Sequence, residues 1–365
     1  MKIAILTSSR ADYGIYLPLL TAMKSDDFFQ FDVVAFGTHH SKFFGETARQ
    51  IEADGFDIKY KIESLILGDS PQSIVDGMGL TMIKFSQIWG DEDYDLVMAL
   101  GDRYEMFAAA FSTIAFNIPV AHISGGEQTF GAIDNSFRDA LTTLSKIHFT
   151  STEHYKARVI QIKGDNENVF NVGALNLDNL KQHTLLSIDE FKTQFTIDLS
   201  IPSILITCHP ETISYQKNKS YITELISALS EIKDYQLIFT MPNADTAGNQ
   251  IREVISAFIA KSNRAIGVES FGTVGYLSCM KHCSFMLGNT SSGFVEASYF
   301  PKYVINLGDR QKGRIVTPNI KNCPFDKDEI LDAISGYQSF TADQKIEVYG
   351  DGTVALKIIE ILKGI

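Results

Sequence analysis

The stretch Leu287-Gly288-Asn289-Thr290-Ser291-Ser292-Gly293-Phe294-Val295-Glu296 indicates how this chain folds. An apolar run over residues 283–287 ends in Gly288, small hydroxyl residues follow, and a helical pattern opens at Phe294. This order is typical of a strand, a tight turn and a helix N-terminus, where backbone N–H groups and the helix dipole favour a phosphate. Because serine and threonine also favour ordinary helix caps, this stretch alone leaves a plain N-capped helix equally open.

The same alternation of strand and helix recurs along the chain. In the first half, strand-like runs occur at residues 2–7, 31–36, 95–100, 120–123, 148–151 and 169–172, and helical patterns at residues 15–23, 43–53, 104–116, 132–144 and 153–162. In the second half, strand-like runs occur at residues 203–207, 236–240, 264–268, 284–287 and 303–307. Strands separated by helices of this length predict parallel sheets covered on both faces.

A polar stretch over residues 179–200 divides the two series. The sequence therefore predicts two tandem α/β domains, residues 1–180 and residues 181–351. We expect the last helix, within residues 352–365, to join the first domain. In such sheets, ligands bind beyond the carboxyl ends of the strands, so we expect the substrate site in the cleft between the two domains.

Composition and charge narrow the choice of partners. The chain has 365 residues and a net charge of −12, which argues against a nucleic acid or an acidic membrane surface as partner. An anionic ligand must then be held by local Arg, His and backbone N–H groups. The four cysteines form no zinc-binding pattern and indicate free thiols in a reducing compartment. The N-terminus is a strand pattern and not a signal peptide, and no apolar run could span a membrane, so we expect a cytoplasmic protein.

A set of motifs follows the predicted strands in order. They are Thr7-Ser-Ser-Arg10-Ala-Asp12-Tyr13-Gly14, Gly101-Asp102-Arg103-Tyr104-Glu105, Gly125-Gly126-Glu127, Asp134 with Arg138, His209-Pro210-Glu211-Thr212, Asn243-Ala-Asp245-Thr246, Gly288-Asn289-Thr290-Ser291 and Gly308-Asp309-Arg310-Gln311-Lys312-Gly313-Arg314. Each motif alone is weak, but the ordered set, which covers essentially the whole chain, resembles the hydrolysing UDP-N-acetylglucosamine 2-epimerases of sialic-acid biosynthesis. It is also similar to the sister enzymes that act on UDP-2,4-diacetamido-trideoxyhexoses for legionaminic acid.

The resemblance implies a GT-B fold and the release of UDP and an N-acetylmannosamine-type sugar. By matched position, it implies acid/base roles for Asp102, Glu127 and Asp134, and sugar or diphosphate contacts from Arg10, His39, Arg103 and Arg138. It implies nucleotide contacts from His209, Asn243, Phe271, Thr290, Ser291, Glu296, Arg310, Gln311 and Arg314. Helix capping or a structural ion pair is the alternative role for each carboxylate. No metal-ligand spacing is present, and we expect neither a metal nor a redox cofactor.

The chain departs from the family pattern near the predicted catalytic residues. Ser124 stands where relatives carry Glu or His, and Asp139 stands where they usually carry His. Thr143 replaces a frequent Lys, and Asn135 replaces a second Asp. Because a serine hydroxyl cannot exchange a proton near neutral pH without help, these changes predict an altered sugar preference or a weaker enzyme.

Several functions stay open at this point. The preferred one is hydrolysis and epimerisation of UDP-GlcNAc, and the alternative sugar is UDP-N,N'-diacetylbacillosamine. A non-hydrolysing 2-epimerase, a GT-B glycosyltransferase and a nucleotide-sugar-binding protein without activity are the rivals. We expect a homo-oligomer, a dimer or tetramer, because most soluble oligomers are symmetric assemblies of one chain.

Overall fold

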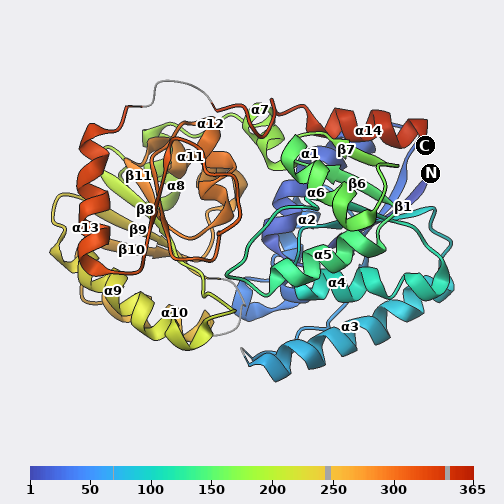
Figure 1. Cartoon of the computed structure of the whole chain (residues 1–365), viewed down its shortest axis with the longest axis horizontal. Coiled ribbons are helices and arrows are strands. Elements are labelled where there is room, and N and C mark those ends of the chain that lie inside the picture. The colour runs from blue at the N-terminus through green and yellow to red at the C-terminus, as the bar shows by residue number, and fades with distance from the viewer. Residues whose placement is uncertain (69, 243–247, 342–345) are drawn as a thin grey trace. The chain divides into compact units, whose positions relative to one another are not determined.

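The computed structural model describes residues 1–68, 70–242, 248–341 and 346–365. It contains two compact units, each built on its own parallel sheet (Figure 1). The first unit comprises Met1–Glu127, Asp134–Gln182 and Val348–Ile365, and the second comprises Gln128–Ile133 and His183–Glu347. The predicted fold class, two Rossmann-like α/β domains with parallel sheets, is confirmed.

The first sheet has seven strands in the order β3-β2-β1-β4-β5-β6-β7, all paired in parallel. Successive residues of β1 point to opposite faces, so Ile3 and Ile5 enter one core while Ala4 and Leu6 enter the other. The strands are β1 Lys2–Thr7, β2 Gln30–Ala35, β3 Ile58–Lys61, β4 Leu96–Leu100, β5 Val120–Ile123, β6 Ile147–Thr150 and β7 Val169–Asn171.

Helices cover both faces of this sheet. Apolar residues of α1, α2 and α14 fill one core, and those of α3, α4 and α5 fill the other. The helices are α1 Arg10–Lys24, α2 Ala48–Ala53, α3 Pro71–Asp91, α4 Tyr104–Phe111, α5 Asp134–Leu144, α6 Glu153–Lys163, α7 Asp178–Gln182 and α14 Val354–Gly364, with short 3-10 turns η1 Gly37–His40, η2 Lys42–Phe44, η3 Ile114–Phe116 and η4 Leu175–Leu177.

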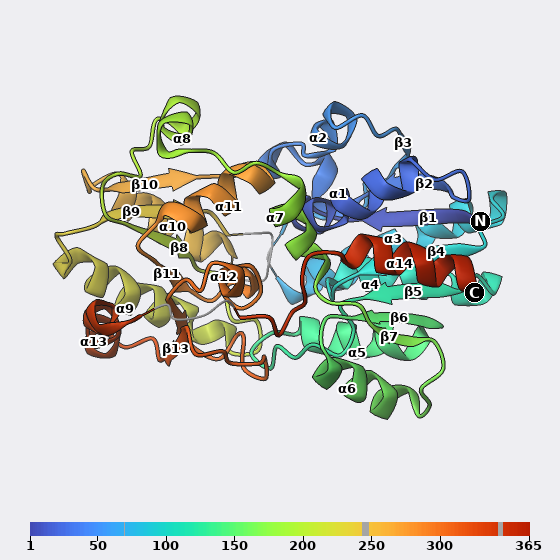
Figure 2. The ribbon, with the colours of Figure 1, turned by 90° about the horizontal axis from the view of Figure 1, so that it is seen from above.

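The C-terminal helix α14 packs in the first unit, against α1, and the two chain ends lie at the same end of this unit (Figures 1 and 2). Its first turn is held by Asp178, whose carboxylate oxygens accept the N–H groups of Val354 at 2.9 Å and Ala355 at 2.7 Å. These two bonds satisfy backbone donors that have no partner within the helix. Residues far apart in the sequence therefore complete one core.

The second sheet has six parallel strands in the order β10-β9-β8-β11-β12-β13. Its core is formed by strand residues such as Ile204, Phe239 and Phe285 with the apolar sides of α9, α10 and α13. The elements are α8 Ile188–Phe195, β8 Ser203–Thr207, η5 Tyr215–Lys217, α9 Asn218–Glu231, β9 Gln236–Thr240, α10 Gly248–Ile259, β10 Ala265–Val268, α11 Gly272–His282, β11 Phe285–Gly288, η6 Ser291–Gly293, α12 Glu296–Tyr299, β12 Val304–Leu307, β13 Ile320–Cys323, α13 Lys327–Ser335 and η7 Gly336–Ser339.

The structure differs from the sequence-based expectation at a few elements. The polar stretch 179–200 contains α8, which begins with a capping box between Ser187 and Glu190. The helix predicted to open at Phe294 is instead the 3-10 turn η6 followed by the four-residue helix α12, so Glu296 begins that helix. Strands β3 and β13 and the 21-residue helix α3 were not predicted.

Candidate active site

The turns after β1, β4 and β5 place polar side chains at one edge of the first sheet. Because these strands are parallel neighbours, their carboxyl ends meet at the same edge. After β1, the carboxylate of Asp12 accepts the N–H groups of Ser8 and Ser9, both at 2.7 Å. These bonds fix the turn from which α1 begins at Arg10, a predicted diphosphate contact that is half-buried.

His39 contacts the last residue of β1, next to this turn, and is fully buried. Its Nε2 is 2.9 Å from Thr7 Oγ1, and its Nδ1 is 2.8 Å from Thr47 Oγ1. Burial lowers the pKa of His39 to about 4, so the imidazole is neutral near pH 7. The structure therefore gives His39 a role in supporting the turn, and its predicted contact with the sugar stays a prediction.

Asp102 follows β4 and forms an ion pair with Arg138 of α5. Arg138 is buried, and its other terminal nitrogen, Nη1, donates to the backbone carbonyl of Glu127 at 2.9 Å. Gly101, just before Asp102, has a φ of +81°, a conformation that favours glycine. His122 of β5 donates from Nε2 to the Gly101 carbonyl at 2.7 Å. Two predicted catalytic residues are thus joined through one guanidinium.

Glu127 ends the turn after β5 and is buried. Its Oε1 accepts a hydrogen bond from Ser151 Oγ at 2.9 Å. Ser124 at the start of this turn has a φ of +66°, an uncommon conformation for a residue with a side chain. At Gly126, with a φ of +80°, an added Cβ would lie 2.4 Å from the Tyr155 carbonyl oxygen. The backbone conformation of the turn that carries the Glu127 carboxylate is therefore restricted by steric contacts.

The remaining predicted site residues of this unit are close in the sequence to Arg138 or Asp102. Asp134 is the first residue of α5, one turn before Arg138, and is half-buried. Arg103 donates from Nε to Glu105 Oε1 at 3.0 Å, which partly neutralises its charge. Asp139, at a position where relatives usually carry His, forms a two-pronged pair with Arg158 at 2.6 and 2.8 Å. This ion pair joins α5, which carries Asp139, to α6, which carries Arg158.

In the second unit, Asn289 organises the predicted nucleotide contacts. Its Oδ1 accepts the His209 N–H at 2.7 Å, and its Nδ2 donates to the His209 carbonyl at 2.8 Å. Its own backbone carbonyl accepts Gln311 Nε2 at 2.9 Å and Arg310 Nη1 at 3.3 Å. Gln311 Oε1 in turn accepts Arg314 Nε at 2.6 Å. Three predicted residues therefore contact the asparagine that follows β11, and Arg314 is linked to it through Gln311.

The other predicted nucleotide contacts are less closely grouped. Thr290 caps η6 through the N–H of Ser292, Ser291 is exposed, and Glu296 is half-buried at the start of α12. Phe271 is buried against Phe191 and Phe195. Asn243 lies outside the described residues. The sequence analysis assigned no role to Asn289, which stands inside one of the quoted motifs, or to His122, which precedes another.

The stretch Gln128–Ile133 belongs to the second unit, whereas Glu127 and Asp134 on either side of it belong to the first. Phe130 N–H donates to the Lys312 carbonyl at 2.9 Å, and Ile133 N–H donates to Thr212 Oγ1 at 2.8 Å. No pattern in the sequence indicated this exchange, because the stretch stands between two motifs of the first domain.

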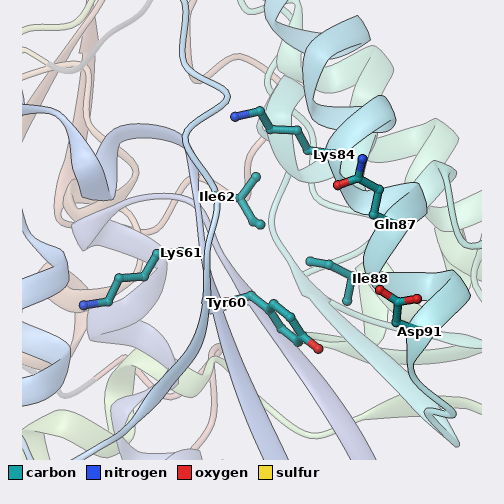
Figure 3. Close-up of a pocket in the computed structure, with 7 residues that line it drawn as sticks. All are labelled: Tyr60, Lys61, Ile62, Lys84, Gln87, Ile88 and Asp91. Carbon is teal, nitrogen blue, oxygen red and sulfur yellow. The ribbon is translucent and has the colours of Figure 1, made fainter.

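Other features lie apart from these residues. A pocket of about 300 Å³ between the end of β3 and α3 contains none of the predicted site residues (Figure 3); it is lined by Tyr60, Lys61, Ile62, Lys84, Gln87, Ile88 and Asp91. In the part of the chain that the structure describes, no group of three or more His, Cys, Asp or Glu residues could hold a metal ion. Within those same residues, no helix is long and apolar enough to cross a membrane.

Comparison with known proteins gives consistent matches along the chain. A family model described as UDP-N-acetylglucosamine 2-epimerase matches residues 21–363. A Campylobacter jejuni protein named GDP/UDP-N,N'-diacetylbacillosamine 2-epimerase (hydrolyzing) is 37% identical over 320 residues, which cover 87% of this chain and 83% of that protein. The Escherichia coli polysialic acid biosynthesis protein P7 is 36% identical over 335 residues, 92% of this chain and 85% of that protein.

A Legionella pneumophila protein named UDP-N,N'-diacetylbacillosamine 2-epimerase (hydrolyzing) is 33% identical over 368 residues, 100% of this chain and 96% of that protein. Among solved structures, the Methanocaldococcus jannaschii UDP-GlcNAc 2-epimerase in complex with UDP-GlcNAc and UDP has a TM-score of 0.83 at 17% identity, and each chain is covered to 100%. At that identity the structural match establishes a shared fold.

Proposed function

The chain belongs to the UDP-N-acetylglucosamine 2-epimerase family, and on this premise we propose that it is a hydrolysing UDP-sugar 2-epimerase. The reaction takes UDP-GlcNAc and water to N-acetylmannosamine and UDP. The observation that carries the proposal is Arg138, which contacts both the carboxylate of Asp102 and the backbone of Glu127. A reaction that moves protons at one sugar carbon needs two acid/base groups held in fixed relation, and this guanidinium supplies such a link.

The chemistry has two steps. In the first, a carboxylate removes the proton from C2 while the C1–O bond to UDP breaks, which gives a 2-acetamidoglycal and UDP. In the second, water adds its oxygen to C1, and a proton returns to C2 from the opposite face, so that carbon is inverted. We assign these proton transfers to Asp102, Glu127 and Asp134. Arg10 and Arg103 would stabilise the negative charge that develops on the diphosphate, and Arg138 would hold the Asp102 carboxylate in place.

The second unit would hold the UDP leaving group. The Asn289-centred contacts fix His209, Arg310 and Gln311 at the ends of β8 and β12, where parallel sheets bind ligands. The N–H groups and hydroxyls of Thr290 and Ser291 suit phosphate oxygens, and Glu296 suits ribose hydroxyls. Arg314, Phe271 and Asn243 complete the proposed nucleotide contacts. In this scheme the diphosphate is held by arginines, a histidine and backbone groups.

A second sugar is a specific candidate. Relatives that are 37% and 33% identical are named for N,N'-diacetylbacillosamine, whereas the relative named UDP-N-acetylglucosamine 2-epimerase from Neisseria meningitidis is 28% identical. The two substrates differ at C4 and C6 of the sugar. Ser124 is smaller than the Glu or His that the family pattern carries, and such a change in pocket shape is the kind that alters sugar preference.

One assay decides among these functions. The protein is incubated separately with UDP-GlcNAc and with UDP-N,N'-diacetylbacillosamine, released UDP is quantified, and the sugar product is identified by NMR. The proposal expects free UDP and a free sugar inverted at C2 from one of the two. A UDP-linked epimer would indicate the non-hydrolysing reaction. UDP binding without turnover of either sugar would indicate a nucleotide-sugar-binding protein and would contradict the proposal.

A further inference from the structure

We propose that Gln128–Ile133 is a positioning segment, through which the loop at residues 308–314 sets the placement of Glu127 and Asp134. Glu127 is the last residue of the first unit before this segment, and Asp134 is the first residue after it. The inference rests on the proposed function, because it takes Glu127 and Asp134 as acid/base groups and the loop as part of the nucleotide site. Gly131 and Thr212 are its positioning residues.

Hydrogen bonds of its backbone N–H and C=O groups hold the positioning segment to the rest of the second unit. Phe130 N–H donates to the Lys312 carbonyl at 2.9 Å. The Gly131 carbonyl accepts the Ile213 N–H at 3.3 Å, and Ile133 N–H donates to Thr212 Oγ1 at 2.8 Å. The six residues therefore have three attachments to the second unit, with the last one immediately before Asp134.

Steric fit makes these attachments specific. An added Cβ at Gly131 would lie 2.5 Å from the Asp309 carbonyl oxygen and 2.6 Å from the Arg310 Cα. These are backbone atoms, which cannot move aside as a flexible side chain can. At Gly313, which has a φ of +98°, an added Cβ would lie 2.7 Å from the Gln128 Cβ and 2.9 Å from the Phe130 ring. The segment and the loop thus fit only with glycine at both contacts.

The loop in turn connects to the predicted nucleotide contacts. Arg310 and Gln311 both donate to the Asn289 carbonyl, at 3.3 and 2.9 Å. The Asp309 N–H donates to Glu211 Oε1 at 2.6 Å, so the turn after β8 also contacts this loop. A ligand bound to Arg310 would therefore restrain the backbone against which Gly131 packs.

At its other end the positioning segment leads into the acid/base residues. Ile133 is followed directly by Asp134, the first residue of α5, and Arg138 lies one turn further along the same helix. Arg138 contacts the Glu127 carbonyl and the Asp102 carboxylate. A displacement of the segment by a fraction of an ångström would reach Glu127 from one side and Asp134 from the other. Since acid/base catalysis depends on such placement, turnover should depend on this packing.

Thr212→Val is the sharpest test, because it keeps the side-chain shape and removes the acceptor of the Ile133 N–H. Thr212→Ser restores the hydroxyl and serves as the rescue. Gly131→Ala tests the steric contact, and Gly79→Ala is its matched control, because Gly79 is exposed in α3 and an added Cβ there would have no neighbour within 4 Å. For each variant we would measure kcat, KM, the Kd for UDP, and hydrogen exchange in residues 134–144 with and without UDP.

For the parent protein we expect UDP to slow exchange at the start of α5. Thr212→Val should lower kcat by about three- to tenfold, the value of one hydrogen bond, and should abolish the UDP effect on α5 while the Kd for UDP stays within about threefold. Thr212→Ser should restore both kcat and the effect of UDP on exchange in α5. Gly131→Ala should lower kcat and UDP affinity together, and Gly79→Ala should change neither.

The outcomes separate the two proposals. If the parent protein neither binds UDP nor releases it from a UDP-sugar, the proposed function fails. If the parent binds UDP and turns over but exchange in α5 does not respond to UDP, the positioning segment is overturned. A Thr212→Val protein that melts at a lower temperature with unchanged kcat would show a purely structural contact and would also overturn it. If Gly131→Ala does not fold, the comparison of Thr212→Val with Thr212→Ser alone tests the positioning segment.

Discussion

Arg138 on α5 forms an ion pair with Asp102 in the turn after β4, 36 residues earlier in the chain. The side chain of Arg138 is 3% exposed and that of Asp102 is 22% exposed, so water reaches the carboxylate but not the guanidinium. The arginine therefore holds the carboxylate in place while leaving one side open to a ligand. This arrangement is compatible with the acid/base role that we propose for Asp102.

Asp102→Asn should abolish most of the activity while leaving UDP binding nearly intact. Asparagine keeps the size of the side chain but cannot exchange a proton, so turnover should fall by about 10²–10⁴-fold. Steady-state release of UDP and calorimetric titration with UDP measure the two properties. Asp165→Asn, an exposed carboxylate paired with Lys163, is the matched control and should keep normal turnover. Near-normal turnover in Asp102→Asn would remove the basis of the proposed mechanism.

Asp134→Asn should lower turnover similarly, and it distinguishes the two chemical steps. If Asp134 serves only the addition of water, the variant should still break the bond to UDP and release 2-acetamidoglycal. Mass spectrometry would detect this product as the sugar minus one water. A variant with full turnover to the epimerised sugar would exclude Asp134 from both steps.

Ser124→Ala should reduce turnover by less than about tenfold, because a hydroxyl is a poor acid or base near neutral pH. Ser124→Gly should in addition stabilise the fold, since the φ of +66° is strained for a residue with a side chain and costs roughly 1–3 kcal/mol. Turnover assays and urea unfolding test these two statements. A loss in Ser124→Ala as large as that in Asp102→Asn would make Ser124 a catalytic residue.

His209→Ala and Arg310→Ala should each weaken UDP binding. A buried hydrogen bond to a charged group contributes roughly 1.5–3 kcal/mol, or about ten- to a hundredfold in affinity. Arg264→Ala is the control, because Arg264 donates to the Tyr235 carbonyl at 2.9 Å, near the amino ends of the strands. Titration calorimetry gives the three affinities. Equal UDP affinity in His209→Ala, Arg310→Ala and the parent would place the nucleotide elsewhere.

The sequence predicted most of the sheets because the buried strands are short apolar runs between helical patterns. It missed β3, with the sequence IKYK, and β13, with the sequence IKNC. Both are edge strands, in which polar residues face water, so their pattern resembles that of a loop. Helix α3 was missed although Ser70 caps it and Pro71 begins it, because Gly77 and Thr81 occupy core positions where apolar residues are expected.

For the site, the positions of the strand ends in the sequence predicted which residues would lie at the carboxyl ends of each sheet. They did not predict which of these residues would form ion pairs or hydrogen bonds with one another. The pairing of Arg138 with Asp102 depends on how α5 lies against the turn after β4, and the spacing of residues does not encode that angle. Asn289 shows the same limit, since a single side chain reaches His209, 80 residues away in the sequence. The exchange of Gln128–Ile133 into the second unit depends on packing against residues 309–313, which no local pattern reveals.

Asp178→Ala should weaken the attachment of α14 to the first unit. The carboxylate accepts two N–H groups of the first turn of α14, and loss of such a cap costs about 0.5–2 kcal/mol. Trp89, the chain's single tryptophan, is buried in α3, so its fluorescence reports unfolding of the first unit. Asp26→Ala removes the exposed pair between Asp26 and Lys363 of α14 and is the control. If Asp178→Ala and Asp26→Ala lower the free energy of unfolding equally, the Asp178 carboxylate does not act as a helix cap for α14.

The first unit should lose stability as the pH falls below about 6.5, because it buries neutral histidines. Burial lowers the pKa of His122 to about 4 and that of His148, its neighbour across β5 and β6, to about 3. In the unfolded chain both imidazoles titrate near pH 6.5. Between pH 6.5 and 4 the unfolded state therefore binds protons that the folded state does not, and the free energy of unfolding decreases as the pH is lowered.

From pH 7 to 5.5, each buried histidine should contribute about 1 kcal/mol to this decrease. Urea unfolding followed by Trp89 fluorescence at several pH values in this range measures it. His122→Gln should flatten the dependence on pH even if it lowers stability overall, because glutamine binds no proton. His154→Gln, which replaces a histidine that is exposed in the folded state, is the matched control. If His122→Gln and the parent show the same slope, the buried imidazole of His122 is not the source of the acid sensitivity.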